Sequence, residues 1–158
     1  MSKLKSFLKI LILLIILSSI VIYAKPCNDH DEECLNLQMS QYLKESLIQK
    51  NKLEKISEKY RKMCSNELDK LPELEFAFEE ELNSVFEITE QNREHALHPS
   101  IDADYYDFLP IRVILVKNSV FLYKKVIVAY EDAIKNKIPA SKFVGTVGML
   151  VEKYGDIR

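Results

Sequence analysis

Apolar residues in the first half of the chain recur three and four positions apart, which is the spacing of one face of an α-helix. Between Pro26 and Pro72 this face comprises Leu35, Met39, Tyr42, Leu43, Leu47, Leu53, Ile56, Tyr60, Met63 and Cys64. No glycine and no further proline interrupts the stretch, and the polar run QKNK at 49–52 is the one candidate break. The pattern predicts either a single long helix or a hairpin of two shorter helices that turns at 49–52.

A second helical pattern follows Pro72, a residue that suits the first turn of a helix. Its apolar side consists of Leu74, Phe78, Leu82, Val85 and Ile88. Pro99 disfavours helical backbone in the residue before it, so we expect this helix to end near His98.

Residues 111–137 carry a third pattern, which allows two interpretations. Their many β-branched residues suit a β-hairpin that turns at Lys117 and Asn118. A helix would instead align on one face Ile111, Leu115, Leu122, Val126, Ala129 and Ala133. We favour a buried central helix, which Pro139 ends.

Ser141 can cap a last helix that Gly155 closes. Gly145 and Gly148 lie inside this helix, and each costs about 1 kcal/mol unless close packing compensates. The sequence therefore predicts an all-α fold, an up-and-down bundle of four or five helices in a single domain at 25–158.

The first 24 residues differ from the rest. Lys3, Lys5 and Lys9 precede an uncharged apolar run, Ile10–Ala24. A basic start, a short apolar core and a terminal small residue are the parts of a secretory signal peptide. As a helix the run would be about 22 Å long, short of the roughly 30 Å hydrocarbon core of a membrane. We expect cleavage before Lys25 and a secreted or periplasmic protein. The alternative is an uncleaved N-terminal anchor that crosses the membrane once.

The formal net charge is −2, and loss of the three N-terminal lysines takes it to −5. Nucleic acid and anionic lipid both favour a concentrated positive face, so we expect no nucleic-acid partner, and a membrane only if the N-terminal segment stays attached. The sequence has no HExxH, GxSxG or CxxC motif, and its three glycines all follow residue 144. We therefore expect no cofactor and no catalytic residue.

The segment KPCNDHDEECL at 25–35 is rich in carboxylates and holds two of the three cysteines. Contiguous ligands rarely converge on one ion, whereas the same residues make a good helix start. Asp29 can act as the N-cap with Glu32 three positions later, in a variant of the capping box.

The cysteines allow three pairings, and helix geometry ranks them. In a continuous helix Cys34 and Cys64 are about 45 Å apart, so we favour a disulfide between Cys27 and Cys34. Cys64 then stays a buried thiol or links two chains into a dimer. If the chain turns at 49–52, Cys64 returns to the N-terminal cysteines and can pair with either of them.

Two neighbouring segments contain candidate metal ligands. Glu94, His95 and His98 lie within one turn of a predicted helix end, and Asp102, Asp104 and Asp107 follow in the next connection. A zinc site needs three or four ligands, and a calcium loop needs a glycine that DADYYD lacks. We interpret the histidines as a helix end and the aspartates as a capping turn. A metal-dependent or acid–base enzyme that uses both segments is the alternative.

Tyr105 and Tyr106, beside Asp104, are the best candidates for partner binding, because exposed tyrosine gives a large contact area at low entropic cost.

The early cysteine pair and the sequence YEDA at 130–133 resemble bacterial lysozyme-inhibitor domains of the LprI type, although the cysteine spacing differs and tryptophan is absent. The resemblance assigns no residue a role.

We therefore expect a small exported helical protein that acts by binding a partner protein, as an inhibitor, immunity or accessory protein. A membrane-anchored assembly component is the further alternative, because it would retain the N-terminal apolar run.

Overall fold

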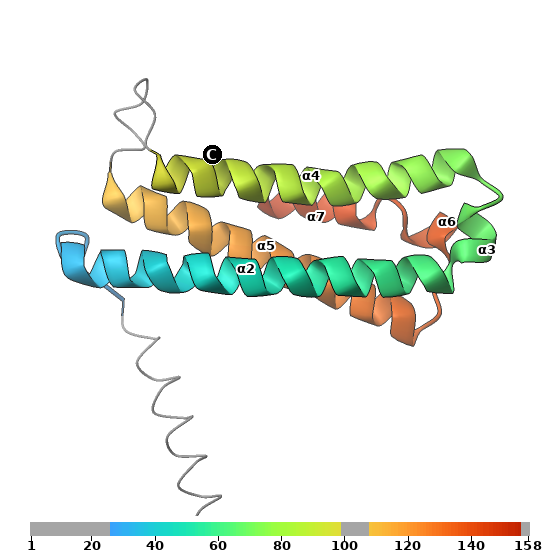
Figure 1. Cartoon of the computed structure of the whole chain (residues 1–158), viewed down its shortest axis with the longest axis horizontal. Coiled ribbons are helices and arrows are strands. Elements are labelled where there is room, and N and C mark those ends of the chain that lie inside the picture. Colours follow the sequence, from blue (N-terminus) through green and yellow to red (C-terminus); the bar gives the residue numbers. More distant parts are fainter. Residues whose placement is uncertain (1–25, 99–107, 156–158) are drawn as a thin grey trace, which may run out of the picture.

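Helices form all the regular secondary structure in the computed structural model, which describes residues 26–98 and 108–155. Three helices are long: α2 (Glu32–Met63), α4 (Pro72–Leu97) and α5 (Leu109–Lys135). Three are short: α3 (Ser65–Leu68), α6 (Ala140–Phe143) and α7 (Thr146–Tyr154). The long helices lie alongside one another, with α7 against α4 and α5 (Figure 1). The predicted all-α bundle is confirmed, while the predicted signal peptide at 1–24 lies outside the described residues.

The start of α2 is fixed by Asp31, whose carboxylate accepts a hydrogen bond from the Cys34 N–H at 3.0 Å. The prediction of Asp29 as the N-cap is therefore wrong. Asp29 lies in a turn that the Asp31 N–H closes by donating to the Asn28 carbonyl at 2.9 Å, so the helix begins after this turn. A disulfide joins Cys27 to Cys34, with 5.8 Å between their Cα atoms, and ties the turn to the first turn of α2.

α2 continues through 49–52 without a break, so the hairpin alternative is wrong. The helix ends at Cys64, and the four-residue α3 reverses the chain. Near this end the Arg61 guanidinium pairs with the carboxylates of Glu75 and Glu79 in α4. These ion pairs join the end of α2 to the beginning of α4, which returns antiparallel to it (Figure 1).

α5 is a single helix, so the β-hairpin alternative for residues 111–130 is wrong. It lies at the centre of the molecule and packs against α2, α4 and α7. Its buried residues are Val113, Leu115, Val116, Ser119, Val120, Leu122, Tyr123, Val126, Ile127, Tyr130 and Ala133. Burial on three sides outweighs the small helix-propensity cost of the β-branched residues.

α2 and α5 run in the same direction, and α5 crosses obliquely behind α2 (Figure 1). The Lys124 ammonium pairs with the Glu45 carboxylate at 3.0 Å, and the Tyr60 hydroxyl donates a hydrogen bond to the Ile138 carbonyl at 3.0 Å. The partners are 79 positions apart in the first pair and 78 in the second. Ile138 follows the end of α5, so the Glu45–Lys124 pair is the one that fixes which residues of the two helices lie level at this point.

The predicted last helix is interrupted, which corrects the sequence-based expectation. Gly145 adopts a left-handed conformation with φ of 92°, which separates α6 from α7, and Glu81 of α4 accepts a hydrogen bond from its N–H. Ser141 lies inside α6 and does not cap it. The Glu67 carboxylate instead accepts the N–H bonds of Ala140 and Ser141, at 2.8 and 3.1 Å.

The core at the α3–α6 end of the bundle is an aromatic cluster. Tyr60, Phe78, Tyr130 and Phe143 come from α2, α4, α5 and α6 and have ring centroids 4.8 to 6.1 Å apart. The cluster therefore joins α2, α4, α5 and α6 through aromatic contacts. The opposite end is held by the disulfide and the start of α5.

Candidate functional site

α2 buries polar residues and leaves large apolar residues in solvent. On its inward side Ser46, Gln49 and Ser57 are buried. On its flanks Leu37 is 59% exposed and Ile48 is 50% exposed. A stable surface helix normally shows the opposite arrangement. The flanks of α2 are therefore candidate binding surfaces.

The register of α2 against the bundle explains this inversion. Its inward residues recur every seven positions, as in helices that pack side by side. They form two series, one at positions 35, 42, 49 and 56 and the other at positions 46, 53 and 60. Leu47 lies one position after the second series and is 61% exposed. The prediction that Leu47 faces the core is therefore wrong.

One flank of α2 forms a hollow against α5, which we name the side hollow. It has a volume of about 770 Å³. Its α2 wall carries Leu37, Gln41, Lys44 and Ile48, which lie three and four positions apart on one stripe, and its α5 wall carries Val120 and Lys124. Ser40, Tyr42 and Glu45 complete the lining.

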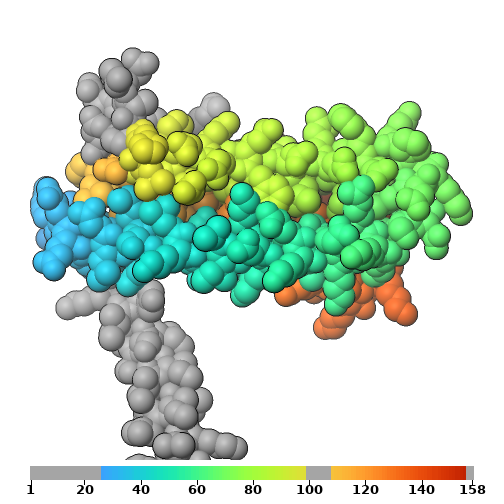
Figure 2. Space-filling view, in the orientation of Figure 1, coloured from blue at the N-terminus to red at the C-terminus, as the bar shows by residue number. Residues whose placement is uncertain are grey.

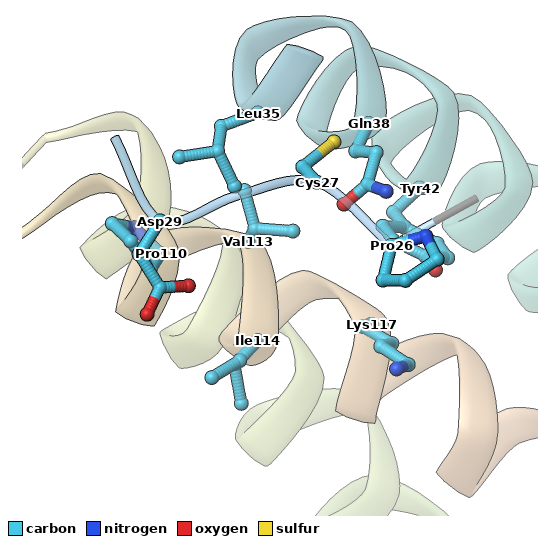
Figure 3. A pocket seen from close by; sticks show the side chains of 10 residues that line it. All are labelled: Pro26, Cys27, Asp29, Leu35, Gln38, Tyr42, Pro110, Val113, Ile114 and Lys117. Carbon is cyan, nitrogen blue, oxygen red and sulfur yellow. The ribbon is translucent and has the colours of Figure 1, made fainter. Parts of the chain in front are cut away.

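A second hollow, the end hollow, adjoins the first, because Tyr42 lines both. Its volume is about 360 Å³, and α2 and α5 supply its walls (Figure 3). Pro26, Cys27 and Asp29 line it as well, so the disulfide-tied segment closes the groove at this end. We call the two hollows together the α2–α5 groove.

Three lysines and two carboxylates line the α2–α5 groove: Lys44, Lys117 and Lys124, with Asp29 and Glu45. Burial favours the neutral form of Glu45, but hydrogen bonds from Gln49 at 2.8 Å and from Lys124 outweigh it and hold the pKa of this carboxyl below its ordinary value. Glu45 and Lys124 therefore neutralise each other. Lys44 on the α2 wall and Lys117 on the α5 wall remain as the cations of the groove, with Asp29 at its closed end.

The other flank of α2 forms a hollow against α4, with α5 visible between the two helices (Figure 2). Its volume is about 780 Å³, and Leu43, Leu47, Phe86 and Leu97 supply apolar walls. Charges of both signs surround it, and the Lys50 ammonium lies 5.7 Å from the centre of the Phe86 ring. Three basic and two acidic residues line this hollow, and Lys44 lines both it and the side hollow.

Of the cysteines, Cys27 and Cys34 are joined, while Cys64 is a free thiol that is 6% exposed. Its sulfur lies 3.9 Å from the Ile138 carbonyl oxygen and borders a hollow of about 410 Å³ beside Met63 and Pro139. A disulfide to a second chain would need this end of α2 to open first.

The candidate metal ligands lie at and beyond the end of α4. Glu94 and His95 are in the last turn of α4, and the His98 N–H donates to the Glu94 carbonyl at 2.7 Å, which closes the helix as predicted. Within 26–98 and 108–155, no three His, Cys, Asp or Glu residues gather closely enough to hold a metal ion. The aspartates at 102, 104 and 107 and the recognition candidates Asp104, Tyr105 and Tyr106 lie outside the described residues.

The apolar stripe predicted from the sequence does not include Leu37 and Ile48 of the groove. Their spacing of eleven positions, with Gln41 and Lys44 between them, is itself helical and was the available signal.

None of the helices in the described part of the chain has both the length and the apolar character of a membrane span.

Comparison with protein-family models, curated proteins and solved structures gives no match.

Proposed function

We propose that this chain is a small exported protein that acts by occupying a surface of a partner protein, in the manner of an inhibitor, immunity or accessory protein. The observation that carries the proposal is the inverted arrangement of α2. Two of its large apolar residues, Leu37 and Ile48, are half exposed or more along a hollow of about 770 Å³, while serine and glutamine take three of its six buried positions. Exposed apolar residues that line a hollow mark binding sites more often than scattered ones do.

Export is part of the same proposal. The basic start and the uncharged run Ile10–Ala24 support a cleaved signal peptide, and the disulfide between Cys27 and Cys34 suits an oxidising compartment. The intact mass of the purified protein tests it. A chain that begins at Lys25 is expected, and a chain that retains residues 1–24 would support the membrane anchor instead.

The test of partner binding places a photo-crosslinking amino acid at Gln41 in the groove and, as a control, at the exposed Glu80 of α4. We expect one protein to be crosslinked through position 41 but not through position 80, and to form a 1:1 complex when both components are purified. Failure to obtain such a complex contradicts the proposal.

The double variant Leu37→Asp/Ile48→Asp supplies the matching loss of function. Both side chains are exposed, so each change should alter the free energy of unfolding by no more than about 0.5 kcal/mol. Binding should be lost while the melting temperature stays nearly the same. A large drop in melting temperature would show that these residues support the fold and do not form a docking surface.

A further inference from the structure

The α2–α5 groove has the shape and the chemistry to receive one more helix. Its two walls are helices that pack directly against each other and run in the same direction, so the groove follows one side of their line of contact. Helix backbones have no unpaired N–H or C=O groups along their length, so an extended strand cannot add to this surface by main-chain hydrogen bonds. Recognition has to come from side chains packed into a groove.

The length of the groove limits the occupant. From Leu37 to Ile48 the α2 wall spans eleven positions, about 16 Å. The segment Pro26–Asp29, which the disulfide holds, closes one end. An occupying helix therefore makes about three turns of contact, with apolar residues at i, i+4 and i+7 or a similar spacing.

The two groove cations define the charge of the occupant. Lys124 pairs with Glu45, and Lys117 lies seven positions before Lys124, so Lys117 is level with Gln38 of α2, with which it lines the end hollow. Lys44 on the opposite wall is then about six residues farther along, or about 9 Å. On a helix, positions i and i+6 are about 9 Å apart along the axis and about 120° apart around it. Two carboxylates with this spacing would flank an apolar stripe and face one lysine each.

We propose that the α2–α5 groove binds an acidic amphipathic helix of the partner protein, about three turns long, with carboxylates about six positions apart on the two sides of its apolar stripe. This inference rests on the proposed function and names the chemistry of the partner. A lipid surface fits less well, because the apolar residues line a hollow, whereas a bilayer is met by residues that protrude.

The test uses two synthetic helical peptides of fifteen residues with the same leucine stripe. One carries glutamates at the two flanking positions, and the other carries lysines there. Binding to the purified protein is followed by amide chemical shifts. We expect the acidic peptide to shift the signals of Leu37, Gln41, Ile48 and Lys117 and to bind at least about tenfold more tightly than the basic peptide.

A charge swap makes the test specific. The variant Lys44→Glu/Lys117→Glu should weaken the acidic peptide about tenfold and strengthen the basic one. The control Lys70→Glu/Lys142→Glu makes the same change in net charge at two exposed positions, one between α3 and α4 and the other in α6, at the other end of the bundle (Figure 1). It should leave both affinities unchanged.

The inference is overturned if neither peptide binds, if both bind equally well, or if the shifted signals map to α4. It is also overturned if phosphatidylglycerol vesicles bind the wild-type protein but not the Lys44→Glu/Lys117→Glu variant, because the groove would then be a lipid surface. A partner crosslinked at Gln41 together with any of these results would leave the proposed function intact and refute only the acidic helix. The absence of a crosslinked partner would refute the proposed function itself.

Discussion

Two tyrosine hydroxyls in the aromatic cluster have different surroundings. The Tyr60 hydroxyl donates a hydrogen bond to the Ile138 carbonyl at 3.0 Å. The Tyr130 hydroxyl is buried and has no hydrogen-bond partner among the described residues. Burial raises the pKa of both phenols well above the ordinary value, so both remain protonated in the folded protein. The rings contribute packing in both cases, whereas the oxygens do not contribute equally.

The substitutions Tyr60→Phe and Tyr130→Phe measure this difference. Tyr60→Phe removes a buried hydrogen bond and leaves the Ile138 carbonyl without it, so the free energy of unfolding should fall by about 1 kcal/mol. Tyr130→Phe removes a buried hydroxyl with no partner, so stability should stay the same or rise slightly. Urea unfolding gives both values. Equal losses in the two variants would show that the Tyr130 hydroxyl is hydrogen-bonded in solution.

At the scale of elements, the separation of α6 from α7 depends on one glycine. Gly145 has φ of 92°, and a Cβ atom built on it meets nothing within 4 Å, so only backbone strain opposes a side chain there. Gly148 lies inside α7, where a Cβ atom would be 3.5 Å from the Glu81 carboxylate, an ordinary contact. The same substitution should therefore act in opposite directions at these two positions.

We expect Gly145→Ala to lower the free energy of unfolding by about 1–2 kcal/mol, because alanine is strained in the left-handed region. Gly148→Ala should raise it by about 0.5–1 kcal/mol, because alanine favours a helix interior. Thermal or urea unfolding of the two variants checks this. A stabilising Gly145→Ala would mean that α6 and α7 can join into one continuous helix, as the sequence alone predicts.

The long helices could be predicted from the sequence because their apolar spacing and their bounding prolines agree. Pro72 opens α4, and Pro99 and Pro139 follow the ends of α4 and α5. The break at Gly145 could not be predicted, because it depends on Glu81, a residue of α4 that only the folded chain brings to the Gly145 N–H.

The groove could not be predicted for a related reason. Period 3.6 alone favours Leu47 as a core residue, and only the seven-residue register of α2 against the bundle puts Ser46 inside and Leu47 outside. Hydrophobic pattern gives the existence of a helix more reliably than the direction in which it faces, since that direction depends on the neighbouring helices.

At the scale of the whole molecule, charge is distributed unevenly. α4 carries eight glutamates and one arginine, whereas α5 carries five basic and two acidic residues. Several carboxylates nevertheless join separate helices, among them Glu45, which links α2 to α5, and Glu67, which links α3 to α6. Hydrogen bonds from Ser141 and Ala140 hold the pKa of Glu67 below its ordinary value, as Gln49 and Lys124 do for Glu45 despite its partial burial.

These lowered pKa values predict how stability changes with acid. A carboxyl whose pKa is lower in the folded state stabilises the fold above its unfolded-state pKa, near 4.5. That contribution is lost as the pH falls through the folded-state pKa. In Glu45→Gln/Glu67→Gln the free energy of unfolding should decline less steeply below pH 4.5 than in the wild type. Urea unfolding between pH 7 and pH 3 measures the slopes, with Glu80→Gln/Glu87→Gln as the charge-matched control. Identical slopes in the wild type and the double variant would contradict the assignment.

The parallel pairing of α2 with α5 also has a consequence for the order in which the protein folds. Contacts between α4 and α5 span 16 positions from Ala96 to Arg112 and 34 from Thr89 to Tyr123, whereas the pair Glu45–Lys124 between α2 and α5 spans 79. Bringing more distant segments together costs more chain entropy and slows folding. In a chain synthesised from its N-terminus, α2 is made before α4 and α5, but α5, against which it packs, is made much later. α2 therefore docks only after α5 has formed, and in the interval its apolar side chains are open to a chaperone or to another unfolded chain.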